Sequence, residues 1–193
     1  MEKKQPPSRL DALNAVRTLI AYMGDDPDRA GVQDTPRRFI CAWEDAWGAG
    51  YQTAPPELTK FFSREGNQDE MVLVRDIAVH SHCEHHLAPF FGACTIGYIP
   101  DPNRGILGLS KFARIVNHFS RRLQVQERLT TQIADYFVKN ISANVAVVMR
   151  CSHMCMFSRG VRESNSTTST TALRGVFFNE RQARDEFLRE AQK

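Results

Sequence analysis

The chain has 193 residues, of which 42% are hydrophobic, enough for one well-buried core with a short appendage at either end. Its formal net charge of +3 comes without the Lys/Arg blocks of nucleic-acid-binding arms, which argues against a polymer ligand and favours a small anion. We expect a cytoplasmic protein with reduced thiols, because the start lacks an apolar leader, no stretch approaches the roughly 20 apolar residues of a membrane helix, and five cysteines are an odd number.

Two amphipathic helices are predicted before residue 51. Apolar residues recur at helical spacing from Leu10 to Met23 and stop at Gly24. Thr35-Pro36 is typical of an N-cap followed by a first-turn proline, and an apolar face continues from there to Trp47. We therefore expect an N-terminal helical extension over residues 1–70.

Residues 71–193 predict one α+β domain. Strands are expected at Met71–Val79, Gly92–Ile99, Val145–Arg150, Met154–Phe157 and Ala172–Phe178, and helices begin at Ser110, near Gln126 and near Glu180. The segment Ser164–Thr171 fits a flexible linker by composition, although its threonines also suit a strand. Because strands and helices are segregated along the chain, the order predicts antiparallel pairing rather than βαβ units.

Cys83 and His86 are the first candidate metal ligands. Two residues separate them, so a thiolate and an imidazole can reach one ion from a single tight turn. Spacing cannot choose the next ligand, because Cys151 and Cys155 both lie near His153. Three committed ligands are typical of a catalytic zinc site that keeps water in the fourth position.

The alternative is a structural zinc that only staples the strands. Its fourth ligand would be His82, His85 or His153, and the protein would then be an oligomeric binding protein without catalysis. Histidines beside a metal also suit proton transfer, because their pKa lies near neutrality. His85 and His153 are therefore candidates for general acid/base catalysis as well.

Four further charged residues are candidates for binding a ligand. Glu127 either sits on a solvated helix start or accepts two N–H donors from a guanine-like edge. Lys111, Arg114 and Arg159 suit phosphate groups, although each is equally consistent with an ordinary surface charge.

Five motifs follow one another along the second part of the chain. They are Ser81-His82-Cys83-Glu84-His85-His86, Gly108-Leu109-Ser110-Lys111, Gln124-Val125-Gln126-Glu127-Arg128-Leu129, His153-Met154-Cys155 and Ser158-Arg159-Gly160. Together they resemble GTP cyclohydrolase I, the first enzyme of folate and pterin synthesis. The likeness runs from about Met71 to Leu188, and Thr35-Pro36-Arg37-Arg38 extends it upstream.

This resemblance implies a fold and an assembly. The expected fold is a T-fold, in which an antiparallel four-stranded sheet is backed by two helices and preceded by a helical extension. The expected assembly is a toroidal homodecamer. One departure is His82, because the family pattern has methionine immediately before the ligand cysteine.

The resemblance also implies a metal site and a reaction. It selects Cys155 over Cys151, so that Cys83, His86 and Cys155 hold Zn²⁺. His153 then falls at the catalytic position, where it shuttles a proton while a zinc-activated water attacks C8 of GTP and formate is lost. The implied product is 7,8-dihydroneopterin triphosphate.

The remaining site residues take roles from the same resemblance. His85 and Ser110 match positions assigned to later proton transfers, when the ribose opens, rearranges and recloses. Gln126 and Glu127 match the pair that reads guanine. Lys111, Arg114 and Arg159 match positions that contact the triphosphate. In the family these contacts come partly from neighbouring subunits, so a monomer would have an incomplete pocket.

Rival enzyme classes fit the sequence less well. A zinc nucleoside deaminase pairs His-x-Glu with Pro-Cys-x-x-Cys, and the chain lacks that second half. A pyruvoyl-pterin synthase is expected to use only histidine ligands, and a nitrile reductase is expected to have no zinc. The cysteine ligands argue against both of these classes.

Overall fold

The computed structural model describes residues 6–58, 61–63 and 70–193. The chain falls into two compact units that divide between Ala49 and Gly50. The predicted boundary after residue 70 stays a proposal, because it adjoins residues 64–69, which lie outside the described part. Within the described part, no helix combines the length and the apolar character needed to cross a membrane.

The first unit is helical, as predicted. It contains α1 (Arg9–Tyr22), α2 (Thr35–Ala42) and the π-helical turn η1 (Trp43–Trp47), and the 3₁₀ turn η2 (Ala49–Tyr51) follows at the unit boundary. The side chain of Ser8 caps α1 by accepting a hydrogen bond from the backbone N–H of Asp11. Thr35 is not the N-cap that we predicted. Asp34 precedes the helix with nearly helical backbone angles, so Thr35 already belongs to the first turn.

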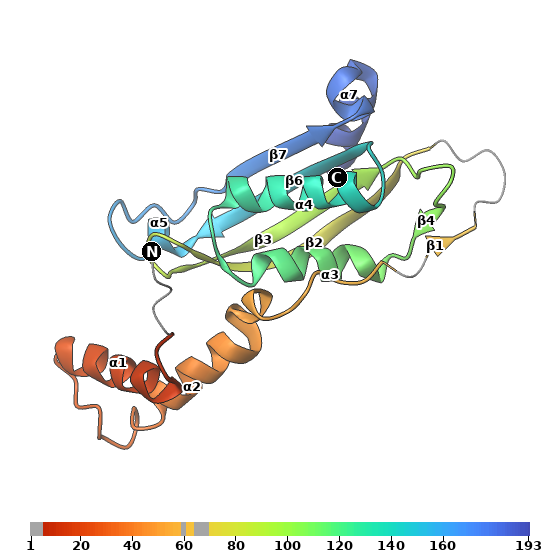
Figure 1. Ribbon diagram of the computed structural model, residues 1–193. Coiled ribbons are helices and arrows are strands. Elements are labelled where there is room, and N and C mark those ends of the chain that lie inside the picture. Colours follow the sequence, from red (N-terminus) through yellow and green to blue (C-terminus); the bar gives the residue numbers. More distant parts are fainter. Residues whose placement is uncertain (1–5, 59–60, 64–69) are drawn as a thin grey trace, which may run out of the picture. The chain divides into compact units, whose positions relative to one another are not determined.

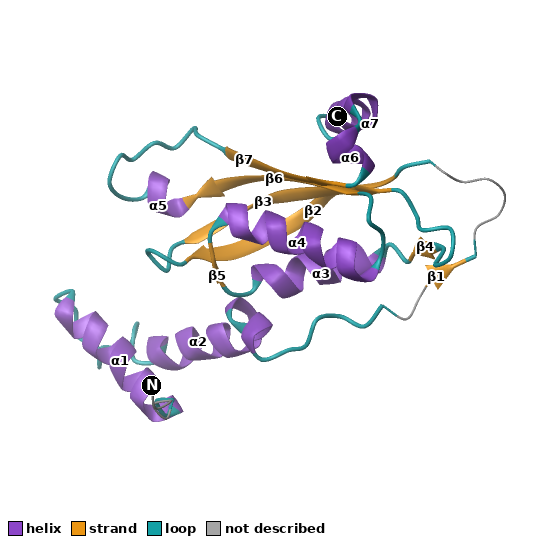
Figure 2. Cartoon of the chain, turned by 45° about the horizontal axis from the view of Figure 1, so that its top comes forward, coloured by secondary structure: helices purple, strands orange, loops and turns teal. Residues whose placement is uncertain are grey.

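The second unit is built on a five-stranded sheet in the order β5-β2-β3-β6-β7 (Figures 1 and 2). The strands are β2 (Val72–Cys83), β3 (Pro89–Tyr98), β5 (Leu123–Gln124), β6 (Val145–His153) and β7 (Thr168–Arg174). The four long strands are antiparallel, which confirms the predicted sheet. The short β5 adds a parallel pair to the edge of β2. A separate two-stranded sheet joins β1 (Phe61–Phe62) to β4 (Ile106–Leu107).

Two helices cover one face of the large sheet, α3 (Ser110–Ser120) and α4 (Gln126–Asn140) (Figures 1 and 2). The apolar residues on one face of each helix recur every three or four positions, and most of them are fully buried against the strands. Phe112, Ile115, Leu129, Ile133 and Phe137 form most of this helical contribution to the core. The predicted pair of helices behind the sheet is therefore confirmed.

The opposite face of the sheet carries the short α6 (Val176–Asn179) and the C-terminal α7 (Arg181–Glu190). Phe177 and Phe187 from these helices pack with Ala146 and Val148 of β6. Residues 145, 147 and 149 of the same strand belong to the other core cluster, as expected when side chains alternate between the faces of a sheet.

Two further local predictions were wrong. Met154–Phe157 is not a strand but the single-turn helix α5, because β6 ends at His153. The predicted strand Ala172–Phe178 is interrupted at Gly175, whose φ of 60° turns the chain into α6. The predicted helix start at Ser110 is confirmed, and Leu109 occupies the N-cap position without a side-chain cap. The segment left open between linker and strand becomes β7 from Thr168 onward.

Candidate metal and catalytic site

A tight hairpin between β2 and β3, here called the metal turn (residues 83–88), presents the first group of candidate ligands. The N–H of Cys83 donates to the carbonyl of Ala88 at 2.8 Å, and the N–H of Leu87 donates back to the carbonyl of Cys83 at 2.9 Å. Leu87 has a φ of 55°, a left-handed conformation that a branched side chain seldom adopts. This reversal places His85 and His86 beside the buried Cys83.

The ligand atoms of Cys83, His85 and His86 all lie within 4.8 Å of one another. Sγ of Cys83 is 3.7 Å from Nδ1 of His85 and 3.7 Å from Nδ1 of His86. Nε2 of His86 also accepts a hydrogen bond from Arg159 at 2.7 Å. Because both imidazoles are equally close to the sulfur, geometry alone does not choose between His85 and His86 as a ligand.

Cys155, on α5, lies beside Cys83 but outside the group of Cys83, His85 and His86. Burial raises the pKa of its thiol, and the charge of Cys83 and a hydrogen bond with the Cys83 side chain raise it further. Cys151, the competing cysteine, lies in the hydrophobic core with 1% exposure, and burial raises its pKa to about 12. Thiolates and imidazoles are the donors that zinc prefers, so the residues at this end of the sheet fit such an ion.

His153 lies at the end of β6, where strand register pairs it with Phe90 of β3. The two rings stack with their centroids 4.8 Å apart and an interplanar angle of 10°. Burial lowers the pKa of His153, and the charge of Glu127 opposes that shift in part. The imidazole is therefore held mainly neutral near pH 7, the state in which it can accept a proton.

Gln126 fixes the orientation of the His153 ring from the start of α4. Its side-chain nitrogen donates to the carbonyls of Met149 and Thr168 and to the hydroxyl of Thr170, each at 3.0 Å. The amide oxygen must then face His153, whose Nε2 donates to it at 2.8 Å. With 1% exposure, the side chain that we predicted as a guanine contact is buried and bonded to protein.

Glu127 and Arg159 are exposed at the same end of the sheet. Glu127 occupies the first turn of α4, next to Gln126, and its charge acts on His153. Arg159 reaches the metal turn through its hydrogen bond to His86. The structure thus groups these two predicted substrate contacts with the candidate ligands and with His153.

Three other predicted residues, Ser110, Lys111 and Arg114, lie at the far end of α3. The N–H of Leu107, just upstream of α3, donates to the hydroxyl of Tyr98 at 2.7 Å. Tyr98 ends β3, and its backbone is about 26 Å from that of Phe90 at the usual rise per strand residue. Nζ of the buried Lys111 donates to the carbonyl of Glu57, whereas Ser110 and Arg114 are exposed. Within one chain these residues do not meet the metal turn.

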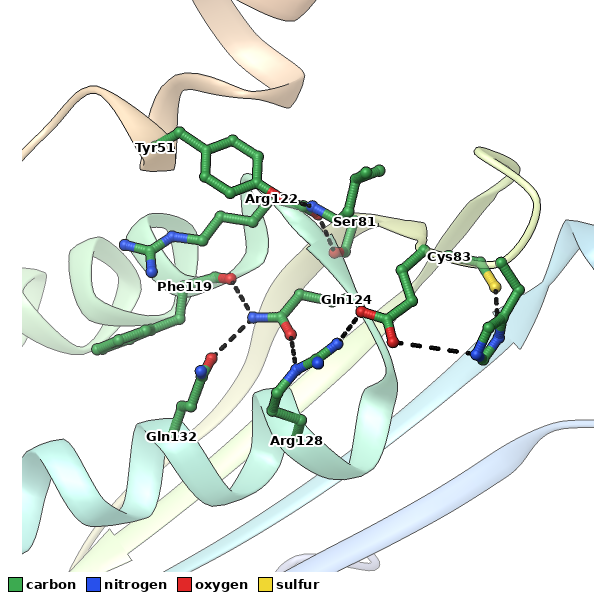
Figure 3. A network of polar contacts seen from close by, with 11 residues as sticks. Tyr51, Ser81, Cys83, Phe119, Arg122, Gln124, Arg128 and Gln132 are labelled. Carbon is green, nitrogen blue, oxygen red and sulfur yellow. Dashed lines mark hydrogen bonds and ion pairs between the residues drawn. The ribbon is translucent and has the colours of Figure 1, made fainter. Parts of the chain in front are cut away.

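A polar network lies behind the metal turn and was not predicted from the sequence (Figure 3). It connects Glu84 to Arg128 on α4 and to Gln124 on β5. In the sequence, the only indication of this network was that Gln124 and Arg128 are four residues apart. At this spacing a side chain in the first turn of a helix can reach back to the strand that precedes it. The pairing with Glu84 depends on the tertiary fold.

The family model and the curated relatives that match this chain agree on one family. A family model described as GTP cyclohydrolase I matches residues 12–192. A protein named GTP cyclohydrolase 1 from Janthinobacterium sp. (strain Marseille) is 49% identical over 174 residues, which cover 89% of this chain and 86% of the relative. Another of that name, from Maricaulis maris (strain MCS10), is 45% identical over 185 residues, or 95% of this chain and 89% of the relative.

Among solved structures, the crystal structure of the archaeosine synthase QueF-Like in the apo form aligns with 57% of this chain and 97% of its own. The TM-score is 0.44 at 15% sequence identity.

Proposed function

The chain belongs to the GTP cyclohydrolase I family, and we propose that it converts GTP and water into 7,8-dihydroneopterin triphosphate and formate at the metal turn. This reaction is the first step of folate, pterin or deazaguanine synthesis. The observation that supports it most directly is the convergence of Cys83, His86, Cys155 and His153 at one end of the sheet.

Cys83, His86 and Cys155 hold the metal, and their two thiolates and one imidazole favour Zn²⁺. Zinc, when bound with an open position, lowers the pKa of water so that hydroxide is available near neutral pH. Cys151 is set aside because its thiol is in the core. The partial exposure of Cys155 suits a ligand that must be reached by an ion.

His153 moves the proton that opens the purine imidazole ring when water attacks C8. Because Gln126 holds its Nε2–H, the nitrogen left to exchange a proton with the substrate is Nδ1. The stacked Phe90 excludes water from one face of the ring. His85 and Ser110 serve the later proton transfers, when the ribose opens, undergoes an Amadori rearrangement and recloses.

Glu127 reads the guanine edge by accepting two N–H donors, a contact that its exposed place in the first turn of α4 allows. Gln126 completes this pair through its backbone N–H, one of the first-turn donors that an α-helix leaves without an internal partner. The triphosphate is bound by Lys111, Arg114 and Arg159.

The active protein is a homo-oligomer, which we propose to be a decamer. Ser110, Lys111 and Arg114 lie a helix length from the residues beside the metal turn, so a complete pocket requires these residues from another subunit. The location is the cytoplasm, which the five free thiols support because cysteines stay reduced there.

Incubation of the metal-loaded protein with GTP tests the proposal. We expect release of formate together with the rise of dihydroneopterin triphosphate absorbance. Formate without pterin would instead show ring opening without rearrangement and would implicate His85 and Ser110. If the assembled, zinc-containing protein yields neither product, the structural-zinc binding protein becomes the better description.

A further inference from the structure

Glu84 lies between Cys83 and His85 in the metal turn, and its carboxylate faces two partners. One oxygen forms an ion pair with Nη2 of Arg128 on α4. The other oxygen lies 3.9 Å from Nε2 of His85 (Figure 3). The carboxylate therefore lies between the imidazole of His85 and the guanidinium of Arg128 on α4, the helix that follows β5.

Arg128 is held in turn from the protein interior. Its Nε donates to the side-chain oxygen of Gln124 at 3.1 Å, and Gln124 is only 2% exposed. The amide nitrogen of Gln124 donates to the carbonyl of Phe119 at 3.0 Å and to the side-chain oxygen of Gln132 at 2.8 Å. These two acceptors leave the amide oxygen facing Arg128, so a buried group fixes where the guanidinium points.

The backbone ties the same elements together. The N–H of Glu84 donates to the carbonyl of Gln124 at 3.0 Å, and Cys83 pairs with Gln124 where β5 joins β2. Gln124 therefore holds the metal turn by its main chain and Arg128 by its side chain. An exposed ion pair alone contributes little, but this one is attached at both ends to ordered backbone.

We propose that Glu84 and Arg128 are positioning residues that hold the His85 imidazole in place for the later proton transfers. The inference rests on the proposed function, which gives His85 that part of the reaction. In this proposal both residues act through His85 and not on the substrate itself. The ring of His85 is exposed, so the carboxylate behind it restricts an imidazole that would otherwise sample several rotamers.

The test uses Glu84→Gln and Arg128→Gln in the full-length, metal-loaded protein, with formate and dihydroneopterin triphosphate measured separately. We expect formate release within about threefold of wild type and pterin formation lowered about 10- to 100-fold, as displaced catalytic groups generally cause. The double variant should match either single variant, because both break one connected unit. Zinc content and KM for GTP should not change.

The matched control is Asp135→Asn, which breaks the ion pair between α4 and Arg174 at 2.8 Å. That pair is also partly exposed, and it should leave the formate-to-pterin ratio unchanged. The inference would be overturned if both products fell equally, if zinc were lost or if KM rose. It would also be overturned if the loss of pterin formation in the double variant equalled the product of the two single losses. Wild-type release of both products upholds the proposed function however the variants behave.

Discussion

The side-chain oxygen of Gln126 lies 2.8 Å from Nε2 of His153 and determines which nitrogen of that ring carries the proton. The side-chain amide of Gln126 cannot flip to exchange its nitrogen and oxygen, because the nitrogen already donates to two backbone carbonyls and a hydroxyl. A neutral His153 therefore carries its proton on Nε2 and presents Nδ1 as the acceptor. When Nδ1 gains a proton, the hydrogen bond to Gln126 can persist.

This relationship predicts that Gln126→Met lowers kcat by about 10-fold or more and leaves KM for GTP within about twofold, because proton transfer loses its orientation while binding does not. The carbonyls of Met149 and Thr168 lose a donor, so the free energy of unfolding should fall by about 1–3 kcal/mol. Steady-state kinetics and urea unfolding measure both effects.

Thr170→Val is the control, since it spares the bond between Gln126 and His153. A raised KM with unchanged kcat would make the side chain a guanine contact.

A second prediction concerns Glu127 as the reader of the guanine edge. Inosine triphosphate lacks the exocyclic amino group, so wild type should prefer GTP by roughly 10-fold or more in kcat/KM, the equivalent of one hydrogen bond to a charged acceptor. Glu127→Ala should abolish the preference, because neither N–H then finds its acceptor. The measurement is kcat/KM for both nucleotides. If the variant keeps the wild-type ratio, Glu127 does not read this edge.

A third prediction distinguishes the metal ligands from the catalytic histidine. Cys155→Ser should lose bound zinc and turnover, whereas His153→Ala should keep zinc and lose turnover. Cys151→Ser is the matched control in the same segment and should keep zinc, because Cys151 is 1% exposed in the core. Metal analysis of each purified variant decides the matter. Loss of zinc from His153→Ala would make His153 a ligand.

Local patterns predicted the parts of the fold that depend on neighbours in sequence. The helices α3 and α4 followed from apolar periodicity, and Cys83 with His86 followed from ligand spacing within one turn. Met154–Phe157 was misassigned because four apolar residues carry no period that separates a helix from a strand.

Features that depend on distant segments could not be read from the sequence. The bonds of Gln126 reach backbone atoms of β6 and β7, which lie 23 and 42 residues away. The pairing of Glu84 with Arg128 spans 44 residues. Likewise, only the course of α3 along the sheet shows that Ser110 is remote from the metal turn of its own chain.

That separation gives a fourth prediction, on shared sites. Ser110→Ala and His153→Ala should each lack pterin formation. If the pocket takes Ser110 and His153 from different subunits, dissociating and reassembling the two variants together should restore pterin formation at about a quarter of the sites, since random mixing leaves that fraction intact. Separate reassembly of each variant is the control. No recovery in verified mixed oligomers would place both residues in one subunit.

The fifth prediction concerns His118, a buried histidine of α3 outside the metal site. Nε2 of His118 lies 2.6 Å from Nη2 of Arg122. Arginine can only donate, so the ring accepts there and its Nδ1–H faces the hydroxyl of Thr53 at 3.3 Å. A second proton on the ring would remove this acceptor and place two positive charges together. Accordingly, burial and then the charge of Arg122 lower the pKa of His118.

Because the pKa of His118 is lower in the folded chain than the usual value of about 6.5, the unfolded chain binds more protons as pH falls. The contribution of His118 to stability is complete above pH 6.5 and is lost below it, by at most about 1.4 kcal/mol per pH unit. Urea unfolding at pH 7.5, 6.5 and 5.5 should show this decline, and His118→Gln should reduce its slope. The slope that remains comes from His82 and His153, whose pKa values burial also lowers. An unchanged slope in His118→Gln would mean that His118 does not titrate between these pH values when the protein unfolds.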